Sequence, residues 1–99
     1  MGTSWTKKED EILCEYCIEQ YVLKKSCSPI GIIVSSCVSN SAFEGREAGS
    51  IRMRVSNIKA ILEENNIPNT VPLKQLSNFA KQTESILLAL LVKHGIRAK

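Results

Sequence analysis

The side chains best suited to metal or redox chemistry in this 99-residue sequence are its four cysteines. Cys14 and Cys17 form a Cys-x-x-Cys pair, but their neighbours predict a regular helix, whereas a structural zinc site needs thiolates that converge tetrahedrally. Cys27 and Cys37 stand alone, with no second pair of this kind. We therefore expect buried, reduced thiols and neither a bound metal nor another cofactor.

The residues that could act in acid–base or nucleophilic catalysis also form no catalytic pattern. His94 is the single histidine, and it falls near the predicted end of a helix, where a cation is favourable. The carboxylates from Glu9 to Glu19 are expected to run down an exposed helix face. With no Gly-rich phosphate loop and no Ser/His/Asp arrangement, the sequence predicts that the protein is not an enzyme.

Basic and polar residues around a predicted helix offer a binding surface instead. They can contact phosphates or base edges, and a nucleic-acid or other anion site would consist of Arg46, Ser50, Arg52, Arg54, Asn57 and Lys59. The alternative is that Arg52, Arg54 and Lys59 are simply a solvated helix face. A net charge of +3 permits DNA binding without requiring it.

Two segments resemble the Myb/SANT-like helix-turn-helix family over about residues 3–62. Trp5, Thr6, Glu9, Asp10 and Leu13 match the opening of its repeats, and Gly45, Arg46, Ile51, Arg52 and Arg54 match the closing half. Glu47 replaces a hydroxyl residue of the family, and Val55 replaces an aromatic one. The second segment is also similar to N-terminal modules of some phage and bacterial nuclease-associated proteins. The resemblance implies a regulatory or accessory protein that binds DNA through its third helix.

A second functional class remains open from the same residues. A small inhibitor or sequestering protein, of the kind that phages encode, would use the Arg-bearing helix to engage a host defence protein or a nucleotide ligand. The nearly neutral first two-thirds of the chain favours this alternative, whereas the Gly45–Val55 segment favours DNA.

Helical periodicity predicts the elements that position these residues, in an all-α fold. Thr6 and Glu9 form a capping box for a first helix that ends near Lys25. The run Ile30–Val38 is predicted as helix, with strand as the alternative, and 39–49 as a loop. The third helix is predicted from Ala48 or Ser50 to about Asn65, completing a module over residues 1–65.

A last helix is predicted over residues 70–95, starting near Val71-Pro72. Its apolar residues recur every three or four positions, as in a coiled coil, and are more than we expect one small core to cover. We therefore predict that the protein is a homo-oligomer and that it binds DNA as a dimer. The predicted interface consists of Leu73, Leu76, Phe79, Ala80, Thr83, Ile86, Leu87, Leu90 and Leu91. Domain size, the lack of a signal-like start and the lack of a long apolar run predict one compact cytoplasmic domain without a membrane segment.

Overall fold

The computed structural model describes residues 5–96, and its first helix begins with a side-chain cap. α1 (Lys7–Cys17) starts after Thr6, whose hydroxyl accepts a hydrogen bond from the backbone N–H of Glu9. The Glu9 carboxylate in turn accepts one from the N–H of Thr6. This is the predicted capping box, and it satisfies two donors that a helix N-terminus otherwise leaves free. The helix then continues into a π-helical turn, η1 (Ile18–Leu23).

The middle of the chain forms two further α-helices. α2 (Ile30–Val38) is helical, so the predicted helix is confirmed over the strand alternative. A short 3-10 turn, η2 (Ser41–Phe43), lies within the predicted loop and buries its phenyl ring in the core. Gly45 then adopts a φ of +82°, a left-handed conformation that favours glycine, and the chain turns toward α3. α3 (Ala48–Glu64) has nearly the predicted bounds.

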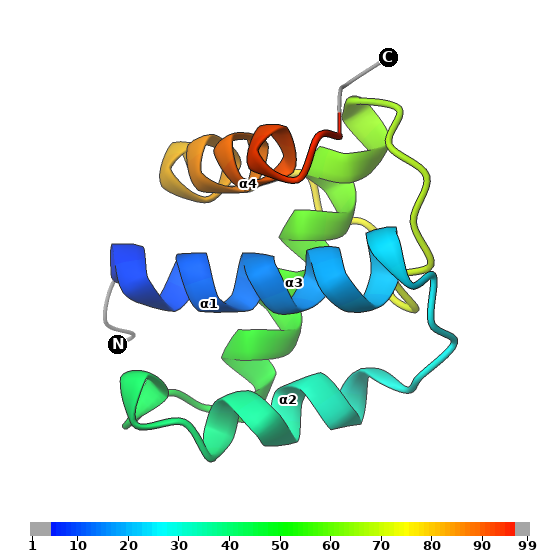
Figure 1. Cartoon of the computed structure of the whole chain (residues 1–99). Helices are drawn as coiled ribbons and strands as arrows, with labels where there is room; N and C mark the ends of the chain where they lie inside the picture. Colours follow the sequence, from blue (N-terminus) through cyan, green and yellow to red (C-terminus); the bar gives the residue numbers. More distant parts are fainter. Residues whose placement is uncertain (1–4, 97–99) are drawn as a thin grey trace.

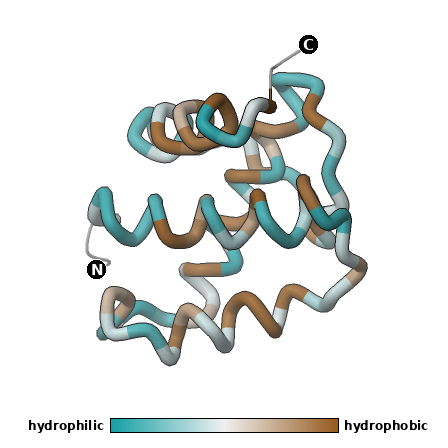
Figure 2. The backbone as a smooth tube through the Cα atoms, in the orientation of Figure 1, coloured by the Kyte–Doolittle hydropathy of each residue, from teal (hydrophilic) through white to brown (hydrophobic). Residues whose placement is uncertain are grey.

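α3 is the central helix of the fold. Figure 1 shows α1 crossing in front of it, with α2 below and α4 above, and α3 contacts all three. Buried side chains from the four α-helices and from η1 form one core, which includes Leu13, Tyr21, Ile33, Ile58 and Leu87. Figure 2 shows hydrophobic and hydrophilic residues alternating along α1, as expected for a helix with one buried face. Because residues 5–96 contain no strand, the described fold is all-α, as predicted.

The last helix is shorter than predicted. α4 (Lys81–Lys93) begins about ten residues later than expected, and residues 67–80 form no helix. Leu76 shows why: its N–H donates to the Ser56 carbonyl at 3.1 Å, and its own carbonyl accepts from the Asn57 side chain at 2.8 Å. Bonds to α3 thus replace the bonds that a continued helix would make, and an irregular segment lies along α3 instead.

α4 packs against the core of its own chain. Its residues Thr83, Leu87 and Leu91 are buried, and α4 contacts both α1 and α3. The radius of gyration is 12.3 Å, close to the roughly 13 Å of a compact 100-residue domain. The helix is therefore part of the domain and does not project from it. Within residues 5–96, no helix combines the length and hydrophobicity needed to cross a bilayer.

Candidate functional site

The first predicted contact residue, Arg46, is engaged within the protein. Its Nε and Nη2 atoms donate to the two carboxylate oxygens of Glu9, at 3.0 Å and 2.8 Å. The same carboxylate closes the capping box of α1, and both side chains are mostly buried. A bidentate, charge-assisted pair is among the strongest polar contacts in proteins. It joins the start of α1 to the turn before α3.

Arg54, which lies on α3, is engaged in a similar way. Its Nε lies 3.3 Å from Oδ1 of the fully buried Asp10, a charge contact in which this Nε makes no hydrogen bond. The carboxylate of Asp10 also accepts hydrogen bonds from the Thr83 hydroxyl and from Gln82 Nε2. Asp10 thereby connects α1 to both α3 and α4. Glu9 and Asp10 were predicted on an exposed face of α1, and the structure corrects this.

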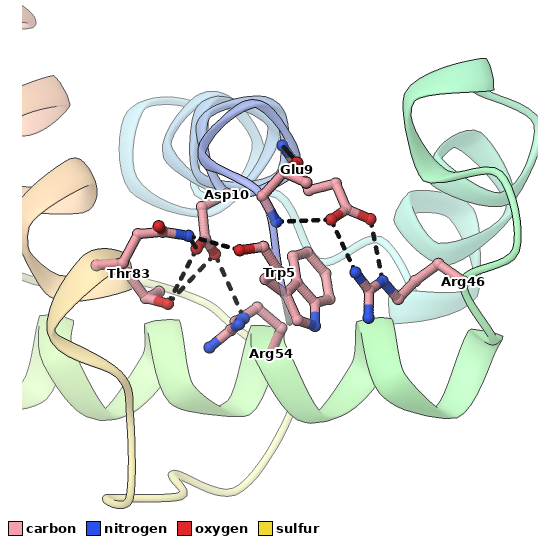
Figure 3. Close-up of polar contacts among 8 residues, drawn as sticks. Trp5, Glu9, Asp10, Arg46, Arg54 and Thr83 are labelled. Atoms are coloured by element: carbon pink, nitrogen blue, oxygen red, sulfur yellow. Dashed lines mark hydrogen bonds and ion pairs between the residues drawn. The ribbon is translucent and has the colours of Figure 1, made fainter. Parts of the chain in front are cut away.

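Trp5 lies between the two arginines (Figure 3). The guanidinium carbons of Arg46 and Arg54 are 4.7 Å and 4.6 Å from the centre of its ring, within the range of cation–π attraction. The same ring system makes a T-shaped contact with Phe43, with ring centres 5.8 Å apart. Trp5, Glu9, Asp10, Arg46, Arg54, Gln82 and Thr83 are called the arginine–carboxylate cluster below.

The two carboxylates of this cluster are each paired with an arginine. Burial acts to raise the pKa of Glu9, but hydrogen bonds from Arg46 and Thr6 outweigh it, so the pKa lies below its ordinary value of 4.5. Burial also lowers the pKa of Arg54, and the charge of Asp10 opposes that effect. Such pairs stabilise a fold only while both partners are present, since removing one leaves a buried charge. The cluster is therefore a structural joint between α1, α3 and α4.

Two more of the predicted contact residues have partners within the chain. Asn57 is buried and donates to the carbonyl of Leu76. Lys59 donates to Glu63 and to Asn69, each at 3.1 Å. Four of the six predicted contact residues are thus used to hold elements of the fold together.

The remaining two, Ser50 and Arg52, lie at an open groove of about 750 Å³. Its lining residues come from the start and first half of α3 and from the irregular segment before α4: Glu47, Gly49, Ser50, Arg52, Met53, Ser56 and Leu73. We call it the α3 groove. Met53 is the most exposed part of its apolar lining, with 60% of its surface accessible. Arg52 and Glu47 supply one charge of each sign.

Comparisons with protein-family models, curated proteins and solved structures find no match for this chain.

The residues predicted to form an oligomer interface divide into three groups. Thr83, Leu87 and Leu91 are buried in the core of a single chain. Ile86 and Leu90 on α4, and Leu73, Leu76 and Phe79 before it, are partly buried and several pack against that core. Ala80 is exposed at the N-cap of α4. The predicted stripe is therefore not one continuous helical surface, because its first half precedes the helix.

The thiols and the histidine are also placed by the fold. Cys14, Cys17 and Cys37 are buried, whereas Cys27 is exposed, and all four are unpaired. Burial raises the pKa of Cys37 to about 11 and that of Cys17 further. Among residues 5–96, no three His, Cys, Asp or Glu side chains converge as a metal site would require. His94 Nε2 lies 2.7 Å from a Glu15 oxygen, joining the end of α4 to α1.

Sequence reasoning identified most cluster residues but assigned the arginines to an external ligand. The signal that pointed to the internal arrangement was the pair of acids in the first turn of α1, opposite two arginines that flank the start of α3. Met53 was not singled out at all. Helical spacing could have found it, because Met53 is two residues from both Ile51 and Val55, which are buried, and therefore lies on the opposite side of α3.

Proposed function

We propose that this chain is a non-catalytic binding module that holds a short segment of a partner protein in the α3 groove. The observation that carries the proposal is the composition of the groove. It combines the exposed Met53 and the partly buried Leu73 with a single cation, Arg52, and a single anion, Glu47. Apolar surface with few charged groups at its edge is typical of a protein-binding surface.

The ligand chemistry follows from the same residues. Met53 is flexible and polarisable, so it adapts to a large apolar side chain, aliphatic or aromatic. Arg52 favours a carboxylate beside that side chain, because a guanidinium pairs with carboxylates through two hydrogen bonds. The proposed ligand is therefore a peptide in which a large apolar residue lies next to an acidic one. A module that covers such a segment on another protein acts as an accessory or inhibitor protein.

The test is a selection from a random peptide library displayed on phage, using the intact protein as bait, followed by calorimetry on synthesised peptides. We expect enrichment of peptides with adjacent large apolar and acidic residues. Met53→Glu and Arg52→Glu should each weaken their binding at least tenfold while leaving the circular dichroism unchanged.

A matched control separates a local from a global effect. Gly49 and Gly31 are each the second residue of a helix, and a Cβ added at either would meet no neighbouring atom within 4 Å. Gly49→Glu alters the α3 groove and should reduce peptide binding, whereas Gly31→Glu lies outside it and should not. Failure to enrich any peptide, or binders that tolerate Met53→Glu, would refute the proposal.

DNA binding is the second candidate function, supported by the position of α3. Ser50, Arg52 and Ser56 line the α3 groove, and α3 carries the second of the two segments whose sequence resembles helix-turn-helix modules. Engagement of Arg46 and Arg54 with Glu9 and Asp10 leaves fewer cations for phosphates, which is why DNA ranks second.

The DNA test needs Arg52→Ala and avoids Arg54, whose loss would leave Asp10 without its cation. Fluorescence polarisation on a random duplex, between about 50 and 200 mM salt, measures affinity and its salt slope. If DNA is the ligand, Arg52→Ala lowers the slope by about one. Absence of binding at the lower salt concentration excludes this candidate.

A further inference from the structure

The exposed side of α2 differs in character from the rest of the surface. Ile32 and Val38 are 57% and 51% accessible there. Residues 26–43 contain no Asp, Glu, Lys, Arg or His, so an entire helix and both of its flanks are uncharged. Figure 2 shows hydrophobic colour along much of this helix. The exposed residues, called the α2 face below, are Gly31, Ile32, Ser35, Ser36, Val38 and Ser39.

We propose that the α2 face binds a second copy of this chain, in an antiparallel and twofold-symmetric pair. A symmetric contact places each residue near its own copy or a symmetry-related one, so any charge at its centre faces a like charge. The α2 face avoids this cost because it has none. No residue of the α3 groove belongs to α2, so this inference is independent of the proposed function.

Helix geometry makes the face complementary to itself. Ile32 and Val38 are each three residues from Ser35, so they lie about 4.5 Å from it along the axis and about 60° to either side. Gly31 and Ser39 are four residues from Ser35, on the sides of Val38 and Ile32 respectively. When a second α2 is placed antiparallel on a twofold axis at Ser35, each Val38 lies over the partner's Gly31 and each Ile32 over the partner's Ser39. The large side chains thus meet the small ones.

Charges at the two ends of α2 favour the same orientation. Lys24 and Lys25 are exposed before the helix, and Glu44 is exposed after it. Figure 1 shows these flanking segments at opposite ends of α2. Antiparallel pairing brings the basic end of one copy toward the acidic end of the other, whereas parallel pairing brings like charges together. The helix dipoles also oppose one another in the antiparallel arrangement.

One helix face from each copy is a small interface, so the pair should be weak, with a dissociation constant of roughly 1 µM to 1 mM. Sedimentation velocity over a concentration series up to about 1 mM is the appropriate measurement. We expect the weight-average mass to rise from 11.0 kDa toward twice that value. A mass that stays monomeric throughout overturns the proposal.

Two single variants locate the contact. Gly31→Glu puts a large charged side chain where Val38 of the partner should lie, and it should weaken association at least tenfold. Because a Cβ at this exposed position would meet no atom of its own chain within 4 Å, we expect the monomer fold to be preserved, which circular dichroism checks. Gly49→Glu, at the matched position of α3, should associate like the native protein. Native-like association of Gly31→Glu, or loss in Gly49→Glu, contradicts the assignment.

Mixing two variants tests the orientation. Val38→Lys should also fail to self-associate, because it removes an apolar contact and places an ammonium group in the interface. In an equimolar mixture with Gly31→Glu, the new carboxylate at position 31 of one chain faces the new ammonium at position 38 of the other. The mixture should recover at least a tenfold gain in association over either variant alone. A mixture no stronger than its components would overturn the antiparallel pair.

Discussion

Neutralising Asp10 without changing its shape tests whether the arginine–carboxylate cluster holds the helices together. Asp10→Asn removes one charge from a side chain that is fully buried, and it creates no cavity. Arg54 then keeps a buried charge without a counterion. Breaking a buried pair in this way costs about 3 to 5 kcal/mol.

The structure places the expected loss at the lower end, about 3 kcal/mol. The side chain of Arg54 is 12% accessible, so it retains some contact with water. It also retains the face of Trp5, at 4.6 Å from the ring centre. The hydroxyl of Thr83 still has an amide oxygen to donate to. A domain of this size has a total stability of about 5 to 15 kcal/mol, so the loss is a large fraction of the whole.

Urea denaturation followed by far-ultraviolet circular dichroism measures this loss, and a double mutant isolates the charge pairing. Asp10→Asn combined with Arg54→Met removes both charges and should be more stable than the sum of the single losses by about 2 kcal/mol. Glu63→Gln, which disrupts the more exposed pair with Lys59, should cost less than about 1 kcal/mol. A loss below about 1 kcal/mol for Asp10→Asn, or additive effects in the double mutant, would refute the role assigned to the cluster.

Three further predictions follow from individual contacts. Because the pKa of Glu9 lies below 4.5, its pairing with Arg46 stabilises the native state above that pH and is lost as the pH falls through the lower native value; the urea midpoint should drop there, and less so in Glu9→Gln. Of the four thiols, the one of Cys27 should react at once with an aromatic disulfide reagent and the others only on unfolding, so Cys27→Ser should abolish the fast phase. Asn57→Ala should cost about 1 to 2 kcal/mol and speed limited proteolysis within residues 71–80, since the Leu76 carbonyl loses its donor; an unchanged cleavage rate would contradict this.

The parts of the fold that depend on local interactions were predictable from the sequence. The capping box of α1 involves residues three apart, and the structure contains it. The bounds of α3 follow from its apolar spacing and the Asn65-Asn66 break, and they agree within one residue at the C-terminus. Local signals of this kind are complete within one turn of helix, so no knowledge of distant segments is needed.

The start of the last helix was not predictable in the same way. The spacing of Leu73, Leu76 and Ala80 fits a helix, yet the segment is irregular, because Leu76 bonds to two residues of α3 that lie some twenty positions earlier. Periodicity reports which residues are apolar, and in this segment those residues follow the surface of another helix. A long-range contact therefore overrides the local pattern. The predicted interface residues that precede α4 consequently do not lie on a helix.

Arg46 and Arg54 show that long-range contacts also limit what the sequence predicts about function. Residues through which the chain resembles helix-turn-helix modules, such as Trp5, Glu9 and Arg46, contact one another and hold α1 against α3. A sequence resemblance that depends on such residues therefore reports on the scaffold of the fold. A ligand that competed for Arg46 would have to compensate for leaving Glu9 buried without its cation. Under the proposed function, ligand choice would then depend on residues that the scaffold does not engage. Glu47, which departs from the family pattern, and Met53 both line the α3 groove, so the groove is where binding specificity should be sought.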